Sequence, residues 1–357
     1  MKLSSLPYLI QKEILDHLSF KNLFLLSLCS KNTKNFIIRI QKHVLEKVEQ
    51  VQYWINGAVM WIDLQMDSSQ NRDMVLKLYE NDYDFTKWQR CDSVEEVGVD
   101  ELGTSTYFFR CPTNPSNLHA KYTPDTVESI IENIHIRLYD LLGNHTKYWM
   151  SSVRDGRTNF LPMLRNIQKM EISGDGLRPA KVDKFLNRST CLEHFTWRTI
   201  GARHGRLRRN SKINNIDTVY VSAGSKVYED VLSSFNGRHV FLKDNDIYRP
   251  NVAQFLNEWK SGEKYRNLEV IGMEDIFDIQ RISRSVAFKR LKKAVEYSFV
   301  RKFGEPSSSF RGDCKFKSQL YLVRQSDGRV ASVMLSDYSI FMGVWNMTEA
   351  EFRASFR

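Results

Sequence analysis

The sequence of 357 residues lacks most of the features that mark secreted, membrane-bound or disulfide-stabilised proteins. It has only five cysteines, and no two of them form a C-x-x-C pair, so we expect neither a disulfide framework nor a zinc module. No apolar run near its start approaches the roughly 20 residues needed to span a bilayer, and charged residues interrupt any signal-peptide pattern. We therefore expect a chain of the cytoplasm, the nucleus or both, with no membrane partner.

Arrangements typical of catalytic or cofactor sites are also missing. The eight histidines form no H-x-H or H-E-x-x-H pattern, and no G-x-S-x-G elbow occurs. No Walker loop is present, and no G-x-G-x-x-G follows a strand-like run. The sequence therefore predicts a protein that is not an enzyme, with no cofactor and no metal site.

What the chain does have is enough apolar material for a core. Apolar residues make up 42% and charged residues 26% of the chain, as in an ordinary globular protein. Its length predicts two or three domains. The patterns below divide it into a helical segment at 1–45, a linking α+β region at 46–160 and a repeat-like domain at 161–357.

Residues 4–40 have the pattern of three short helices. Ser4 or Ser5, Ser19 and Ser30 are candidate helix caps, and Pro7 suits a first helical turn. Helices this short are marginally stable alone, and their apolar positions surround more than one face. We expect an apolar surface that a partner covers, formed by Leu6, Pro7, Ile10, Ile14, Leu15, Leu18, Leu23 and Leu26.

This segment resembles an F-box. The resemblance is carried by "LP…EIL…L" over residues 6–18 and by "LFLLSLCSK" over residues 23–31. It implies that these helices dock on a Skp-type adaptor, which joins F-box proteins to a cullin-RING ubiquitin ligase. The alternative is a helical cap that packs only on the rest of the chain.

The second half contains an internal repeat. The pattern apolar-x-x-apolar-x-apolar begins at residues 167, 192, 216 and 268, with a degenerate copy at 240–242. The period is about 24 residues, and helix-like segments lie at 180–187, 227–234 and 252–259. Units of a strand and a helix that stack on their neighbours predict an irregular leucine-rich-repeat-like array. An ordinary α/β domain with chance spacing is the alternative.

The sequence pattern of the C-terminal part predicts antiparallel strands. Residues 321–333 predict a β-hairpin with Asp327-Gly328 in its turn, followed by a strand at 341–345 and a short helix from Thr348. The motifs "FLNEWKSG", "NLE", "YLVRQSDGR" and the terminal "VW" resemble the nematode F-box-associated domain of type 2, over roughly residues 160–350. That resemblance implies a domain that presents protein substrates to the ligase.

The formal net charge of +10 is concentrated in two segments. Residues 198–212 carry six bases and no acid, which predicts a basic loop. Residues 281–302 carry eight bases and one acid, and we expect a helix there that buries Phe288, Leu291 and Val295. Such clusters bind acidic or phosphorylated proteins or nucleic acid, or they form a solvated face. The candidate partner site is Arg203, Arg206, Arg208 and Arg209.

Taken together, the sequence predicts an α/β (α+β) fold with an N-terminal three-helix F-box, a strand–helix array and a terminal hairpin. Its predicted function is substrate recognition in a Skp–cullin–F-box ubiquitin ligase, with an unidentified protein substrate. The alternative is a basic nucleic-acid-binding module whose N-terminal helices merely cap it, which is less favoured because no nucleic-acid-binding signature occurs.

Overall fold

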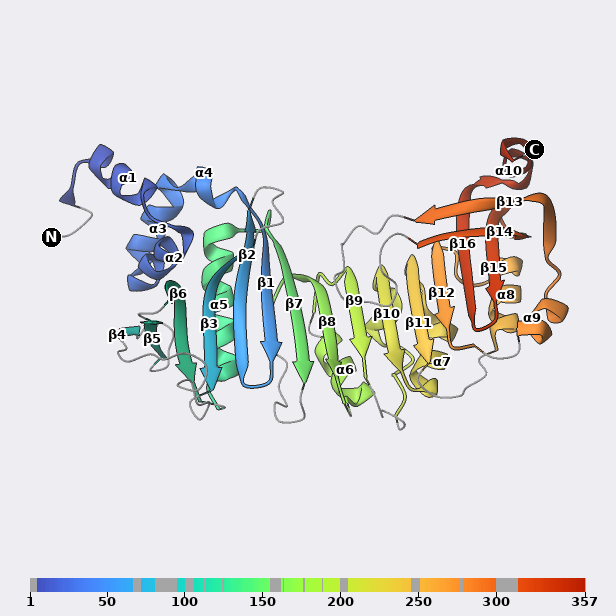
Figure 1. Ribbon diagram of the computed structural model, residues 1–357, viewed down its shortest axis with the longest axis horizontal. Helices are drawn as coiled ribbons and strands as arrows, with labels where there is room; N and C mark the ends of the chain where they lie inside the picture. The colour runs from blue at the N-terminus through green and yellow to red at the C-terminus, as the bar shows by residue number, and fades with distance from the viewer. Residues whose placement is uncertain are drawn as a thin grey trace. The chain divides into compact units, whose positions relative to one another are not determined.

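The computed structural model describes most of the chain in two compact units. The described residues are 5–66, 72–80, 95–99, 106–111, 114–123, 125–154, 162, 164–175, 177–187, 189–199, 205–244, 251–276, 279–299 and 314–356. The first unit comprises Met1–Ser173 and Arg188–Leu192, and the second comprises Gly174–Asn187 and Glu193–Arg357. The expected mixed α/β class is confirmed (Figure 1). The boundaries at residues 45 and 160 stay predictions.

The first unit begins with the expected short helices. They are α1 (Tyr8–Asp16), α2 (Phe20–Cys29) and α3 (Lys31–Ile40), and a single turn α4 (Lys42–Leu45) follows. Ser30 caps α3 by accepting a hydrogen bond from the Thr33 amide at 3.1 Å. Ser19 precedes α2 with an extended backbone, but its side chain makes no capping hydrogen bond. The serines therefore mark two of the three helix starts.

The rest of the first unit is a mixed sheet with one long helix. Its strands are β1 (Val48–Asn56), β2 (Val59–Met66), β3 (Arg72–Glu80), β4 (Glu95–Val99), β5 (Thr106–Cys111), β6 (Asn114–Tyr122), β7 (Lys147–Arg154) and β8 (Ile167–Gly174). Their order in the sheet is β8-β7-β1-β2-β3-β6-β5-β4. Helix α5 (Val127–Leu142) lies on one face of the sheet in Figure 1 and buries Ile130, Ile134 and Leu138.

The second unit contains the repeat-like strands. Strands β9 (His194–Arg198), β10 (Thr218–Ala223), β11 (His239–Asp244) and β12 (Val270–Glu274) pair in parallel and in chain order. Helix α6 (Pro179–Leu186) precedes β9, α7 (Ser225–Ser234) lies between β10 and β11, and α8 (Val252–Ser261) lies between β11 and β12, all at the expected helical segments. The first copy of the pattern forms β8, which starts in the first unit. The strand–helix succession is confirmed, whereas the leucine-rich-repeat assignment stays a prediction.

The pairing register of β9 to β12 explains why the repeat pattern has apolar residues at fixed positions. Val219 pairs with Phe195 on one side and with Val240 on the other, and Val240 pairs in turn with Ile271. The next apolar position forms the same ladder through Trp197, Val221, Leu242 and Met273. All eight side chains are buried, with exposed fractions of 1% or less. Each copy therefore buries its apolar residues against its neighbours.

An antiparallel region completes the second unit. Its strands are β13 (Lys289–Phe299), β14 (Cys314–Val323), β15 (Arg329–Ser336) and β16 (Ser339–Thr348), and they continue the sheet in the order β12-β16-β15-β14-β13. Gly328 has a φ of 73° in the turn between β14 and β15, so the predicted hairpin and its turn residue are confirmed. Helix α10 (Glu349–Ser355) starts with a capping box of Thr348 and Glu351.

One prediction for this region is wrong. Residues 281–302 do not form a continuous helix, because the short helix α9 (Ile279–Ser285) is followed by strand β13. In β13, Val295 and Tyr297 are buried while Glu296 and Ser298 are exposed. This alternation has the period of two that a strand requires, and it outweighs the helical spacing of Phe288, Leu291 and Val295.

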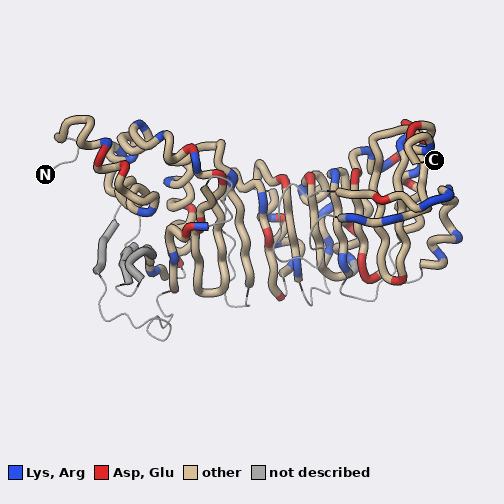
Figure 2. Tube along the Cα trace, turned by 45° about the horizontal axis from the view of Figure 1, so that its top comes forward, with Lys and Arg blue, Asp and Glu red and all other residues tan. Residues whose placement is uncertain are grey.

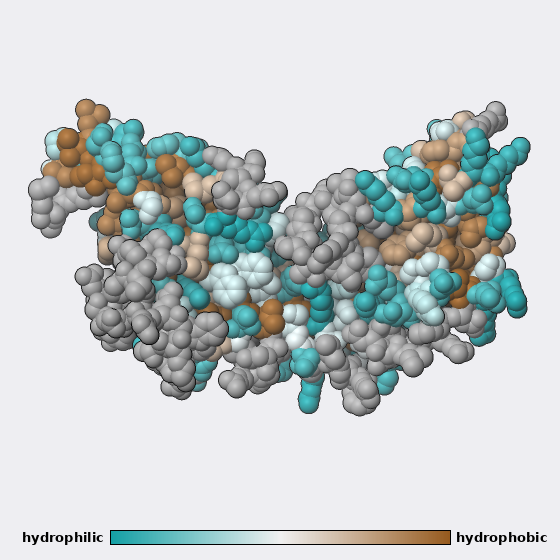
Figure 3. Space-filling view, in the orientation of Figure 1, coloured by the Kyte–Doolittle hydropathy of each residue, from teal (hydrophilic) through white to brown (hydrophobic). Residues whose placement is uncertain are grey.

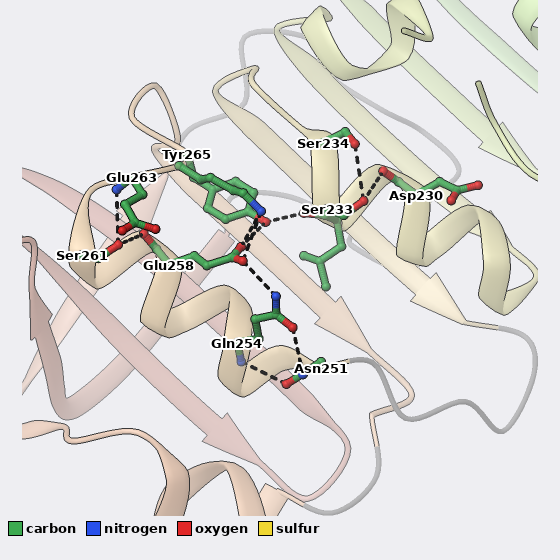
Figure 4. A network of polar contacts seen from close by, with 11 residues as sticks. Asp230, Ser233, Ser234, Asn251, Gln254, Glu258, Ser261, Glu263 and Tyr265 are labelled. Carbon is green, nitrogen blue, oxygen red and sulfur yellow. Dashed lines mark hydrogen bonds and ion pairs between the residues drawn. The ribbon is translucent and has the colours of Figure 1, made fainter. Parts of the chain in front are cut away.

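A polar network holds the segment after α8 in an unusual conformation (Figure 4). Tyr265 has a φ of 58°, which side-chain-bearing residues rarely adopt. Its hydroxyl lies 2.8 Å from the carbonyl oxygen of Leu232, to which it donates, and 3.3 Å from the Glu258 carboxylate. Gln254 and Lys264 donate to the same carboxylate at 2.9 and 3.1 Å. These bonds fix the turn that leads from α8 towards β12.

A buried arginine joins the terminal hairpin to α8. The Arg324 guanidinium is 2% exposed and donates twice to Asp327, at 2.9 and 2.6 Å. It also donates to the carbonyl of Arg266 at 3.0 Å and lies 5.3 Å from the ring centre of Trp259. Because a buried charge needs partners, these residues require one another. The "FLNEW" and "YLVRQSDGR" motifs therefore meet in space.

Candidate adaptor-binding surface

Helix α1 is attached to the first unit mainly through its C-terminal turn. The Asp16 carboxylate accepts hydrogen bonds from Gln41 at 2.6 Å and from Lys12 at 3.1 Å. These two hydrogen bonds lower the pKa of Asp16 below its ordinary value. Leu15 is 0% exposed and packs into the interior. The attachment leaves the start of α1 with few contacts to the rest of the unit.

The segment just before α1 is held to the helix by the chain itself. Gln11 is 7% exposed, and its amide nitrogen donates to the carbonyl oxygen of Leu6 at 2.6 Å. The carbonyl of Pro7 accepts the first helical hydrogen bond, from the Gln11 backbone, at 3.0 Å. Pro7 has a φ of −53°, which suits this position because proline has no N–H to leave unpaired. Leu6 and Pro7 therefore keep a defined position beside α1.

The outer face of α1 is apolar and exposed. Tyr8, Leu9, Ile10 and Ile14 are 56%, 74%, 48% and 38% exposed. Among the described residues only three other large apolar side chains are exposed to this extent, and none lies in the helices α1 to α4. Figure 3 shows the resulting hydrophobic patch over α1. Exposed apolar side chains gathered on one short helix are typical of a surface that another molecule covers.

Helices α2 and α3 form the support of α1. Phe24, Leu28 and Ile37 are at most 1% exposed and belong to the core of the first unit. Lys34 of α3 forms an ion pair with Asp140 of α5 at 2.5 Å, with only 10% of the lysine side chain exposed. The Asp140 side chain is 39% exposed, and the pair links α3 to α5. The apolar patch is therefore carried by a well-anchored pair of helices.

Most of the residues predicted for the adaptor face are exposed or partly exposed, but two of them are buried. Pro7, Ile10 and Ile14 are exposed, and Leu6, Leu18 and Leu26 are partly exposed. Leu15 and Leu23 were expected on this face as well, but they are 0% and 1% exposed. The reason is that a short helix must bury one stripe against its own unit to stay in place.

Sequence reasoning also missed two exposed residues, Tyr8 and Leu9. The signal for them was the continuous apolar run from Tyr8 to Ile10. Successive residues of a helix are 100° apart, so three apolar neighbours cannot all face the same core.

The basic loop of the second unit is less free than its sequence suggests. The backbone amides of Leu207 and Arg208 donate to the carboxylates of Asp230 and Asp183, at 2.8 and 2.9 Å. The Arg206 guanidinium lies 3.6 Å from Glu229 and 3.8 Å from Asp230. Burial raises the pKa of Asp230. Acidic residues from α6 and α7 thus offset part of the charge.

Of the other three arginines in this predicted partner site, the structure describes two. Arg208 and Arg209 are exposed, and Arg203 lies outside the described residues. Whether these arginines bind a partner stays a prediction.

The part of the chain that the structure describes has neither a metal-binding cluster nor a membrane-spanning helix. No three His, Cys, Asp or Glu side chains there are arranged to hold a metal ion. No helix there has the length and apolar character to cross a bilayer.

Comparison with known families assigns the N-terminal helices. A family model described as the F-box domain matches residues 3–45, the segment that contains α1 to α4. The F-box identified from the sequence is thereby confirmed. No curated protein and no solved structure matches the chain. The resemblance of residues 160–350 to a nematode F-box-associated domain stays a prediction.

Proposed function

We propose that this chain is the substrate-recognition subunit of a Skp–cullin–F-box ubiquitin ligase. F-box domains bind Skp-type adaptors, and the F-box at residues 3–45 supports a role as an adaptor of substrates in such ligases. F-box proteins generally present substrates rather than catalyse the reaction themselves. In the proposed assembly the chemistry belongs to other subunits.

The observation that carries this proposal is the exposed apolar face of α1 within the matched segment. Fully burying one large apolar side chain contributes about 1.5–3 kcal/mol, so four such side chains offer a large gross gain. Loss of translational and rotational freedom offsets much of that gain. The net result fits a specific interface with a few central apolar anchors.

The proposed adaptor face consists of Leu6, Pro7, Tyr8, Leu9, Ile10, Ile14, Leu18 and Leu26. It differs from the face predicted from sequence by gaining Tyr8 and Leu9 and by losing Leu15 and Leu23. The second unit is the proposed substrate-binding part, in agreement with its resemblance to an F-box-associated domain. Its substrate would be an acidic or phosphorylated protein, because its exposed arginines and lysines form clusters.

The experiment is capture of a purified Skp-type adaptor by the chain carrying Ile10→Asp with Ile14→Asp. Both side chains are exposed, so the variant should fold, and we expect adaptor binding to weaken by at least about a hundredfold. The matched control is Ile136→Asp, which places the same change on α5 at a residue that is 51% exposed. Undiminished capture by a folded α1 variant would refute the proposed face.

A further inference from the structure

The second unit ends its sheet in an edge strand with unusual chemistry. Strand β13 is hydrogen-bonded to β14 only, and no other described strand pairs with its outer side. An open strand edge is a template for pairing with another extended chain. Residues 281–293, which run from α9 into β13, hold six bases and no acid.

Five of these bases form what we call the β13 basic edge. They are Arg281, Arg284, Arg290, Lys292 and Lys293, and all five are exposed. None of them forms an ion pair with a residue that the structure describes. The sixth base, Lys289, is different because it pairs with Glu349 at 2.6 Å. Figure 2 shows Lys and Arg gathered along β13 and β14.

A bulge places two of these cations at the surface. Arg290 pairs with Leu320 and Val295 pairs with Ser318, so the four residues 291–294 lie opposite the single residue Gln319. A bulge of this kind interrupts regular pairing and redirects side chains. Lys292, Lys293 and Ala294 are consecutive and all exposed, which a regular strand would not allow on a covered sheet.

The other basic segment provides a contrast. Arg206 has two acidic side chains within 4 Å, and the amides of its loop are bound to Asp183 and Asp230. The five bases of the β13 basic edge have no such partner among the described residues, and the acids Glu349 and Glu296 pair with Lys289 and Lys317 instead. The charge that is left for a partner is therefore greater at β13.

We propose that the β13 basic edge binds an acidic, extended segment of a protein substrate. Exposed lysines and a bulge discourage neutral or basic strands from pairing with an edge, whereas carboxylates would neutralise the same lysines. Residues 289–294 span at most about 20 Å at 3.3 Å per residue, which matches an acidic run of about six residues. This inference names the substrate class for the proposed ligase subunit and rests on that function.

The test uses the full chain and a fluorescent peptide of eight glutamates, followed by anisotropy at low and high salt. We expect binding that weakens as salt rises and that a peptide of eight glutamines does not reproduce. Lys292→Ser with Lys293→Ser should weaken binding about tenfold, as the loss of two exposed charge pairs would. Lys181→Ser with Lys184→Ser is the matched control, because both lysines are exposed in the same unit and lie outside the basic clusters, and it should leave the affinity unchanged.

Any of three results would overturn the inference. Equal losses in both double variants would mean unspecific attraction to a basic protein, and tighter binding of an eight-nucleotide single-stranded RNA would favour nucleic acid. Adaptor capture is measured on the same Lys292/Lys293 variant and should equal that of the unaltered chain. Failure of the peptide to bind while the adaptor is captured would refute this inference and leave the proposed ligase function intact.

Discussion

The large apolar side chains on the outer face of helix α1 are exposed, whereas those of the parallel strands β9 to β12 are buried. In the strands, the second and third apolar positions of the repeat pattern are aligned with those of their neighbours and are at most 1% exposed. In α1, four large apolar side chains are between 38% and 74% exposed. The apolar side chains of the repeat-like strands are thus covered by this chain alone. This difference in exposure supports the view that a second protein covers the exposed apolar side chains of α1.

The largest effect expected from this comparison is on stability. Trp197→Ala removes a side chain that is 0% exposed in the ladder of β9, and we expect a loss of about 3–5 kcal/mol in the free energy of unfolding. Leu9→Ala on α1, at 74% exposure, should change it by less than about 0.5 kcal/mol. Urea unfolding followed by circular dichroism measures both. Similar losses in the free energy of unfolding of the two variants would contradict the difference between the strands and α1.

Local patterns predicted most of the elements. The apolar spacing and serines located α1 to α3, the repeat pattern located β8 to β12, and Asp327-Gly328 located the turn after β14. These features depend on residues that are close in sequence. The misassigned residues 289–299 show the limit, because the strand conformation at Tyr297 is supported by packing with Phe316 and Phe341, which lie further along the chain.

The site was predicted less completely than the fold. Periodicity identified the apolar residues of the N-terminal helices, but it could not tell which stripe faces the chain's own core and which faces outward. Leu15 was therefore assigned to the wrong face and Leu9 was missed. Likewise, the acids that offset Arg206 come from α7, more than 20 residues further along the chain. Such pairings depend on tertiary contacts that local patterns do not show.

A second, smaller effect concerns the interior on which the N-terminal helices rest. His135 of α5 lies with its Nε2 2.7 Å from the carbonyl of Arg165 and its Nδ1 2.8 Å from the Tyr53 hydroxyl. A carbonyl only accepts, so Nε2 carries the proton and Tyr53 donates to Nδ1. Burial lowers the pKa of His135 from 6.5 to about 4. The folded chain therefore keeps this histidine neutral.

This histidine predicts a pH-dependent stability. Below pH 6.5 the unfolded chain takes up a proton that the folded chain refuses, so stability should fall as the pH drops from 6.5 towards 4. The contribution of His135 is at most about 3 kcal/mol at 1.36 kcal/mol per unit of pKa. Urea unfolding between pH 7.5 and 4.5 measures the slope, which His135→Gln should reduce. An unchanged slope in that variant would show that other groups cause it.

The smallest expected effect on the isolated chain is the most direct test of the comparison. Leu9→Gln with Ile10→Gln replaces two exposed side chains of α1 by one that helices tolerate well, so the free energy of unfolding should change by less than about 0.5 kcal/mol. An adaptor that binds only the folded chain adds about 2.7 kcal/mol of stability at a hundredfold excess over its dissociation constant. The unaltered chain should gain this increment and the variant should lose most of it, as urea unfolding with and without adaptor would measure. A variant that is equally stabilised by the adaptor would show that the exposed apolar face of α1 has another purpose.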